Sequence, residues 1–140
     1  VMACGTALAQ AIGRWGNFFN SEAFGLPTNL PWKLYIPVSQ RPQEFIGYEY
    51  FHPTFLYESL LDILIFFVLI VFLKRFSSNK GLVFGIYLIL YSFARIGVEY
   101  LRVDSVLNIF GVPVAQWVSV LLIIFAFFYL GAIVYRDNHS

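Results

Sequence analysis

The sequence predicts an all-α protein, a polytopic membrane helical bundle, and three observations support this fold class. Of the 140 residues, 59% are hydrophobic, and only 12% are charged, about half the usual share of roughly 25% in soluble domains. Three apolar segments, 55–73, 82–101 and 114–135, approach the roughly 20 residues that a helix needs to cross a bilayer. Their many β-branched residues do not favour strands here, because open strands cannot span lipid.

The remaining composition excludes several function classes. A net charge of +1 provides no basic field for nucleic acid. The single cysteine, Cys4, lies in a run of small apolar residues, which is typical of a buried small hydrophobe. The two histidines lie 87 positions apart (His52 and His139), so we expect neither a metal site nor a cofactor.

The first residues predict the end of a further membrane helix. The run VMACGTALAQAIG is apolar, is too short to span a bilayer alone and lacks the charged start of a signal peptide. We therefore expect residues 1–18 to be the end of a truncated fourth helix within a single membrane domain.

Charges in the connectors predict the orientation. Lys74, Arg75 and Lys80 fall within seven residues of one short connector, and basic connectors favour the cytoplasmic side. Segment 19–54 and connector 102–113 would then face the other side, and the C-terminus, with Arg136, would be cytoplasmic.

Segment 19–54 predicts an extracytoplasmic insert at the membrane interface. Five of the six prolines lie in it, so a continuous helix is not expected. Its tryptophan and tyrosines (Trp32, Tyr35, Tyr48 and Tyr50) suit the headgroup level. The insert is either a plain structured loop or a rim over a site.

Segment 91–102 places ionisable groups on a spanning helix. Tyr91, Arg95, Glu99 and Arg102 recur at spacings that put them on one helical stripe. Charges in hydrocarbon cost about 2.5–3.5 kcal/mol each, so these groups need partners. Arg95 and Glu99 either neutralise each other or leave the guanidinium donors of Arg95 available to a phosphate.

The segment FHPTFLYESLLD, residues 51–62, is the second candidate. His52 lies where the insert meets the first full spanning helix, and histidine is the commonest general base, although a histidine beside a proline also suits a structural role. Glu58 and Asp62 are four residues apart and share one helical face. They either form an anchoring cluster with Arg14 or Arg95, which we favour for Asp62, or contribute to the chemistry.

The segment GRWGNFFNSEAFG, residues 13–25, is the third candidate. Arg14, Asn17 and Asn20 follow one another at three-residue spacing, so their side chains can face one cavity, and the glycines permit close approach to a ligand. Such a patch could hold a lipid phosphate and glycerol. The alternative is a satisfied helix-ending turn in which Arg14 pairs with Glu22.

These three segments together resemble a known family. Residues 13–25 resemble the signature of the prolipoprotein diacylglyceryl transferases, G-R-x-G-N-F-hydrophobic-N-x-E-x-x-G, at every fixed position. HPTFLYE at 52–58 resembles the family's H-P-x-x-L-Y-E segment, and YSFARIGVEYLR at 91–102 its Y-x-x-x-R-x-x-x-E-x-x-R helix. AQWVS at 115–119 resembles the start of its final helix.

The resemblance implies an enzyme of the bacterial cytoplasmic (inner) membrane with its active site on the extracytoplasmic side. The implied reaction moves the diacylglyceryl group of phosphatidylglycerol to the lipobox cysteine thiol of a prolipoprotein. The implied partners are these two substrates and the membrane, without nucleic acid. The family has seven membrane helices and an earlier H-G-G segment holding the proposed base, so this chain resembles its C-terminal part.

The resemblance also implies residue roles. Arg14 and Asn17 would bind the lipid headgroup, together with Asn20 at the matched signature position. Arg95 would contact the phosphate. The supporting residues would be Tyr91 and Glu99 beside Arg95, Glu22 to orient Arg14 or another donor, and Gly25 to shape the turn.

The sequence leaves one alternative of another class, a transporter or channel fragment. In that case the Arg95–Glu99–Arg102 stripe would line a polar path. A transporter would place these groups around the bilayer midplane, whereas the enzyme would cluster its arginines near one interface.

Overall fold

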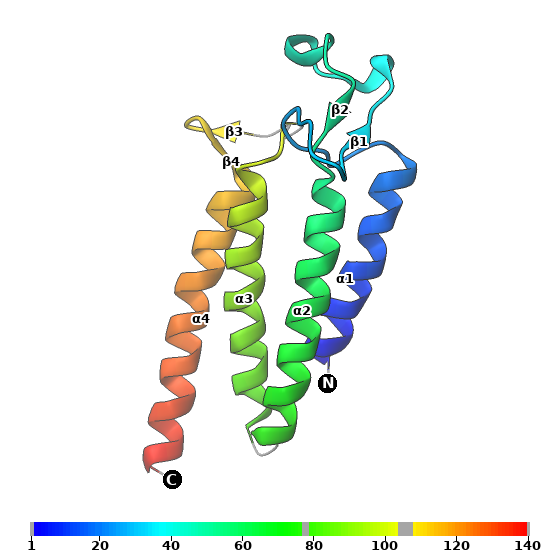
Figure 1. Ribbon diagram of the computed structural model, residues 1–140. Coiled ribbons are helices and arrows are strands. Elements are labelled where there is room, and N and C mark those ends of the chain that lie inside the picture. Colours follow the sequence, from blue (N-terminus) through cyan, green and yellow to red (C-terminus); the bar gives the residue numbers. More distant parts are fainter. Residues whose placement is uncertain (1, 77–78, 104–107, 140) are drawn as a thin grey trace.

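The computed structural model describes residues 2–76, 79–103 and 108–139 and shows four helices side by side (Figure 1). Helix α1 spans Met2–Phe19, α2 Thr54–Arg75, α3 Lys80–Glu99 and α4 Val114–His139. Each helix packs on its neighbour in the chain, α1 on α2, α2 on α3 and α3 on α4. The predicted bundle of membrane helices is confirmed. Residue 1 and parts of two predicted connectors, 77–78 and 104–107, lie outside the described residues.

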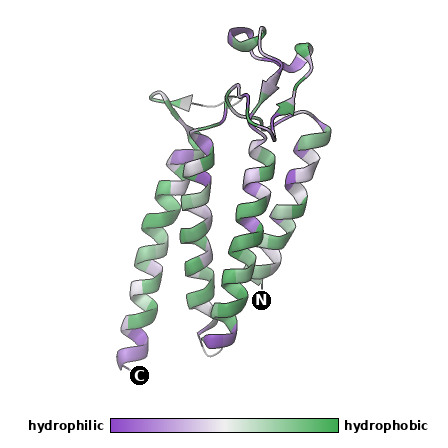
Figure 2. Cartoon of the chain, in the orientation of Figure 1, coloured by the Kyte–Doolittle hydropathy of each residue, from purple (hydrophilic) through white to green (hydrophobic). Residues whose placement is uncertain are grey.

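Three of the described helices are long and apolar enough to cross a membrane. These are Thr54–Arg75, Gly81–Glu99 and Val114–His139. Figure 2 shows their apolar bodies, with polar residues gathered at the connector between α2 and α3 and at the C-terminal end of α4. The chain is therefore a multi-pass membrane protein.

The helix ends follow local chemistry. Pro53 is the N-cap of α2, a place where the fixed φ of proline and its missing N–H are tolerated. Lys74 and Arg75 lie in the last turn of α2, where cations complement the helix dipole. Helix α3 ends at Glu99, two residues before the predicted end. Arg102 therefore lies in the following turn and not on the stripe of Tyr91, Arg95 and Glu99, which corrects that prediction.

Small residues bring α1 close to α2. Ala3, Cys4, Ala7 and Ala11 are the buried residues of α1, and small side chains let membrane helices approach closely. Ser59 of α2, 2% exposed, donates from Oγ to the carbonyl of Ala11 at 2.8 Å. This bond fixes the two helices at the level of the polar site.

The insert between α1 and α2 folds as a small unit above the helices (Figure 1). It holds strands β1 (Leu34–Tyr35) and β2 (Tyr50–Phe51), which pair antiparallel, and the 3₁₀ turns η1 (Val38–Gln40) and η2 (Gln43–Phe45). Its core is Phe24, Ile36 and Phe51. A second short pair, β3 (Asn108–Ile109) with β4 (Val112–Pro113), leads into α4.

Candidate functional site

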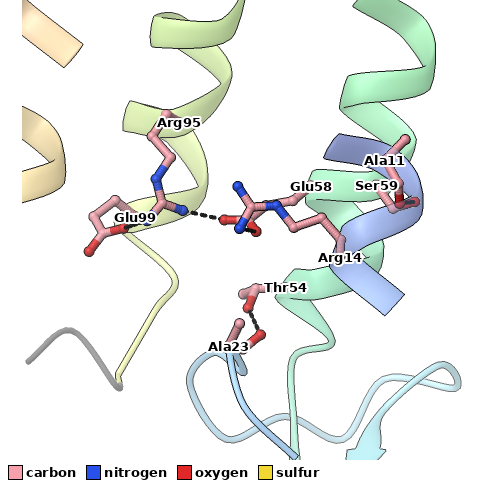
Figure 3. Close-up of polar contacts among 8 residues, drawn as sticks. All are labelled: Ala11, Arg14, Ala23, Thr54, Glu58, Ser59, Arg95 and Glu99. Carbon is pink, nitrogen blue, oxygen red and sulfur yellow. Dashed lines mark hydrogen bonds and ion pairs between the residues drawn. The ribbon is translucent and has the colours of Figure 1, made fainter. Parts of the chain in front are cut away.

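A bridge of charged side chains joins three helices at the end of the bundle that carries the insert. Glu58 of α2 lies between Arg14 of α1 and Arg95 of α3 (Figure 3). Its Oε2 lies 2.9 Å from Nη1 of Arg14, and its Oε1 accepts a hydrogen bond from Nη1 of Arg95. Nη2 of Arg95 pairs in turn with Oε2 of Glu99 at 3.2 Å.

The carboxylates of this bridge are buried, and the arginines are partly open. The side chains of Glu58 and Glu99 are 4% and 3% exposed, whereas those of Arg14 and Arg95 are 21% and 16% exposed. The only polar contact recorded for the Arg14 side chain within the described ranges is that of Nη1 with Glu58. A guanidinium has five N–H donors, so Arg14 retains donors for a further anion.

A small cavity lies against the bridge. It has a volume of about 10 Å³, which is room for about one water molecule. Asp62, 3% exposed, is one turn from Glu58, and its Oδ2 has no hydrogen-bond partner within the described part of the chain. The lining residues are Arg14, Glu58, Leu61, Asp62, Tyr91, Ala94, Arg95 and Val98.

The segment after α1 is fixed against the start of α2. The hydroxyl of Thr54 donates to the carbonyl of Ala23 (Figure 3), and Gly25 N donates to the carbonyl of His52 at 2.8 Å. A Cβ on Gly25 would lie 2.7 Å from the carbonyl oxygen of Leu101 and 2.8 Å from Cβ of His52. Gly25 is therefore needed for close approach of three segments.

Comparison with known proteins shows the family of this chain. A sequence profile of the family described as prolipoprotein diacylglyceryl transferase matches residues 1–132. The chain belongs to this family. A phosphatidylglycerol–prolipoprotein diacylglyceryl transferase of Thermotoga petrophila is 54% identical over 133 residues, which cover 95% of this chain and 44% of that protein.

Two further relatives carry the same name. That of Prochlorococcus marinus (strain MIT 9301) is 53% identical over 127 residues, covering 82% of this chain and 42% of the relative. That of a Nostoc species is 55% identical over 117 residues, covering 80% of this chain and 41% of the relative. The chain thus spans less than half the length of the curated relatives it matches, and these relatives give no support to a transporter or channel.

The structure brings part of the predicted site together. Arg14, Tyr91 and Arg95 line one cavity, and Glu99 joins it through Arg95. Arg14 pairs with Glu58, and no contact with Glu22 is found within the described ranges. The alternative of an Arg14–Glu22 pair is therefore wrong.

Four other predicted residues of the 13–25 segment do not line the cavity beside Arg14. Asn20 and Glu22 line a separate depression of about 460 Å³ against residues 39–42 of the insert. Asn17 and Gly25 line neither space. Positive φ values occur at Ser21 and Ala23 but not at Gly25, so Gly25 does not shape the turn through a left-handed conformation.

His52 lies apart from the arginines, in a hydrogen-bonded chain at the base of the insert. Nε1 of Trp32 donates to the hydroxyl of Tyr57 at 2.8 Å, and Nδ1 of His52 lies 3.0 Å from the same oxygen. Only Nε2 of His52 is left for another partner. Its assignment as a general base stays a prediction.

Sequence reasoning did not single out Glu58 as the residue that joins the two arginines. It placed Glu58 and Asp62 on one helical face and favoured an anchoring role for Asp62 in a cluster with Arg14 or Arg95, whereas the ion pairs with both arginines are made by Glu58. The signal available was the end of the HPTFLYE segment. No group of three or more His, Cys, Asp or Glu able to hold a metal ion is found in ranges 2–76, 79–103 and 108–139.

Proposed function

We propose that this chain forms part of an enzyme that transfers the diacylglyceryl group from phosphatidylglycerol to the lipobox cysteine thiol of prolipoproteins. The convergence of Arg14 and Arg95 on Glu58 carries this proposal. Two guanidinium groups from separate helices lie at one end of a membrane bundle, where a phosphate at the headgroup level can reach them. The names of the relatives support the same reaction.

The reaction requires a leaving phosphate to be stabilised. The thiolate sulfur attacks the glyceryl carbon, a C–S bond forms, the C–O bond to phosphate breaks, and glycerol phosphate departs with the bonding electrons. Guanidinium donors aimed at the phosphate oxygens stabilise that charge. A base must take the thiol proton, since the thiolate is the nucleophile; His52, through Nε2, is this chain's candidate.

The phosphate binds at the outer edge of the cavity. A space of about 10 Å³ is too small for a phosphate, whereas the Arg14 side chain is 21% exposed and retains donors. Glu58 then holds both arginines in position while their outward donors meet the lipid. Asn17, which precedes the turn and is only partly exposed, contributes to the headgroup site.

We place the site on the extracytoplasmic side of a bacterial inner membrane. Lys74 and Arg75 end α2 at the opposite end of the bundle from Arg14, and the last turn of α4 carries Arg136. Basic residues favour the cytoplasmic side. The insert and the charged bridge then face outward, and the C-terminus is cytoplasmic.

The proposal is tested by lipid transfer to a lipobox peptide. The full-length protein, in vesicles containing phosphatidylglycerol, is compared with its Arg14→Ala, Arg95→Ala and Asn17→Ala variants. We expect each variant to lose transfer by at least about a hundredfold, the usual effect of removing one donor to a developing charge.

A matched control separates this site from general charge effects. Arg136, whose side chain is 76% exposed, lies at the other end of the molecule, and Arg136→Ala should transfer at the unmodified rate. Size-exclusion profiles and helical circular dichroism must match among all variants. Wild-type transfer by folded Arg14→Ala would refute the site assignment.

A further inference from the structure

Asp62 is a buried carboxylate beside the charged bridge. It lies in α2 one helical turn further from the insert than Glu58 (Figure 1) and is 3% exposed. Its Oδ2 accepts no hydrogen bond from residues 2–76, 79–103 or 108–139. Burying a polar oxygen without a hydrogen bond is costly, and more so for a charged group. Asp62 therefore requires a hydrogen-bond donor from outside the described chain.

The small cavity against the bridge offers a place for that donor. Asp62 lines it together with Arg14, Tyr91 and Arg95, and its volume is about 10 Å³. A buried water molecule needs roughly 10–15 Å³ of such space and two to four polar partners. The carboxylate can accept from a water, the guanidinium groups can donate to it, and a tyrosine hydroxyl can do either.

The charges around the cavity exclude an ion as its occupant. Arg14 and Arg95 repel a cation, and the carboxylates of Glu58 and Asp62 repel an anion. A neutral molecule that both donates and accepts hydrogen bonds satisfies all four side chains. At this volume such a molecule is water.

Tyr91 is held at the cavity by contacts that continue into the bundle. Its ring stacks on that of Tyr87, with the centroids 5.8 Å apart. The hydroxyl of Tyr87 donates to Oε1 of Gln10 in α1 at 2.9 Å. Tyr91 also shares one face of α3 with Arg95, four residues on. Its ring is therefore fixed beside the arginine before any substrate binds.

We propose that the cavity binds one water molecule, which Asp62 holds against the guanidinium groups of Arg14 and Arg95. Asp62 is then a positioning residue, because it acts on the arginines through the water. The water occupies inward donors and leaves outward donors for the phosphate of the lipid. Side chains ordered in advance lower the cost of binding. This consequence rests on the proposed function, whereas the water site itself does not.

Three variants separate the water site from an effect of charge. Asp62→Leu removes the acceptor oxygens at similar volume, whereas Asp62→Asn removes the charge and keeps one acceptor oxygen. Ala94→Val adds two methyl groups at the cavity wall and displaces the water while Asp62 stays in place. Asp137→Leu is the matched control, because its side chain is 37% exposed in the last turns of α4, far from the cavity.

The first measurement is radiolytic footprinting of the full-length protein in lipid nanodiscs containing phosphatidylglycerol. A short X-ray pulse converts bound water to hydroxyl radicals, which oxidise adjacent side chains, and mass spectrometry locates the added oxygen. Leu61 and Tyr91, which line the cavity, should be oxidised in the unmodified protein. Asp62→Leu should lower this oxidation about tenfold, the effect of losing one hydrogen bond to a charged group.

The other variants make the footprint specific. Ala94→Val should lower the oxidation of Leu61 and Tyr91 as Asp62→Leu does, and Asp62→Asn and Asp137→Leu should leave it unchanged. Helical circular dichroism must match among all variants. Oxidation that is absent from the unmodified protein, or that persists in Asp62→Leu, would overturn the proposal.

Lipid transfer to a lipobox peptide provides the second measurement. Asp62→Leu and Ala94→Val should lower kcat at least about tenfold, because displaced guanidinium groups lose their alignment with the departing phosphate. KM should change by less than about threefold, since the loss falls on the transition state. Asp62→Asn should restore most of the rate. Equal losses in Asp62→Asn and Asp62→Leu would show that Asp62 acts through its charge and would overturn the role of the water. Oxidation that depends on Asp62 in an unmodified protein without transfer would refute the proposed function while supporting the water site.

Discussion

Replacing Glu58 by glutamine tests whether one carboxylate holds the site together. The substitution preserves the shape of the side chain and removes the charge that faces Arg14 and Arg95. An amide has one acceptor oxygen, and its NH₂ group would face a guanidinium donor. At least one arginine therefore loses its partner.

The burial of the bridge sets the expected loss in the free energy of unfolding for Glu58→Gln. Removing one partner of a buried ion pair costs about 3–5 kcal/mol. The arginine side chains keep 21% and 16% exposure, so water can solvate part of the released charge, and we expect the lower end, about 3 kcal/mol. Since roughly 1.4 kcal/mol corresponds to a factor of ten, the equilibrium constant for folding should fall about a hundredfold.

The assay is reversible unfolding in mixed micelles, followed by tryptophan fluorescence and helical circular dichroism. Glu22→Gln is the matched control, because Glu22 is exposed and pairs with no arginine within the described residues. A double-mutant cycle between Arg14→Met and Glu58→Gln should give a coupling energy of about 1–3 kcal/mol. A cycle with no measurable coupling, or unfolding of Glu58→Gln at the unmodified midpoint, would refute the bridge.

The remaining predictions concern the segments that position the site. Gly25→Ala should lower the free energy of unfolding by about 1–3 kcal/mol through overpacking, whereas Gly13→Ala, in open space within α1, should raise it slightly; equal midpoints would contradict the close approach. Ser59→Ala should lower the free energy of unfolding by about 1 kcal/mol, because its buried hydroxyl donates a hydrogen bond to the carbonyl of Ala11 in α1. An unchanged free energy of unfolding would show that this bond contributes nothing to stability. Tyr57→Phe should change the emission of Trp32 by removing its indole partner, and an identical spectrum would exclude that contact.

The fold class could be predicted because membrane helices are defined by local properties. Length and apolarity are sufficient to predict helices at segments 55–73, 82–101 and 114–135. This holds because a membrane helix makes all its backbone hydrogen bonds within the segment. The end of the second of these segments was misplaced. Val98 and Glu99 close the helix and Leu101 turns toward Leu26, a contact with the insert that no local pattern contains.

The sequence could predict which charged residues belong to the candidate site but not how they pair. Arg95 was identified because charges in apolar segments require partners, and Arg14 because its spacing lets it share a helical face with Asn17 and Asn20. Which carboxylate pairs with them depends on the rotation of α2 against both neighbours, and Glu58 and Asp62 share one helical face. Sequence spacing cannot distinguish them, because both satisfy the same periodicity.

The position of α2 explains why three distant segments form one site. Helix α1 packs mainly on one side of α2 and α3 on another, and α1 and α3 have few contacts with each other. The contact between α1 and α3 includes a hydrogen bond from the Tyr87 hydroxyl to Oε1 of Gln10 at 2.9 Å. A carboxylate from the central helix can reach both, and Glu58 lies at the level where Ser59 fixes α1 to α2. The 13–25 and 91–102 segments also meet directly where Gly25 pairs with Arg102, and Glu58 adds a link between their arginines, so a change in α2 should alter both arginines together.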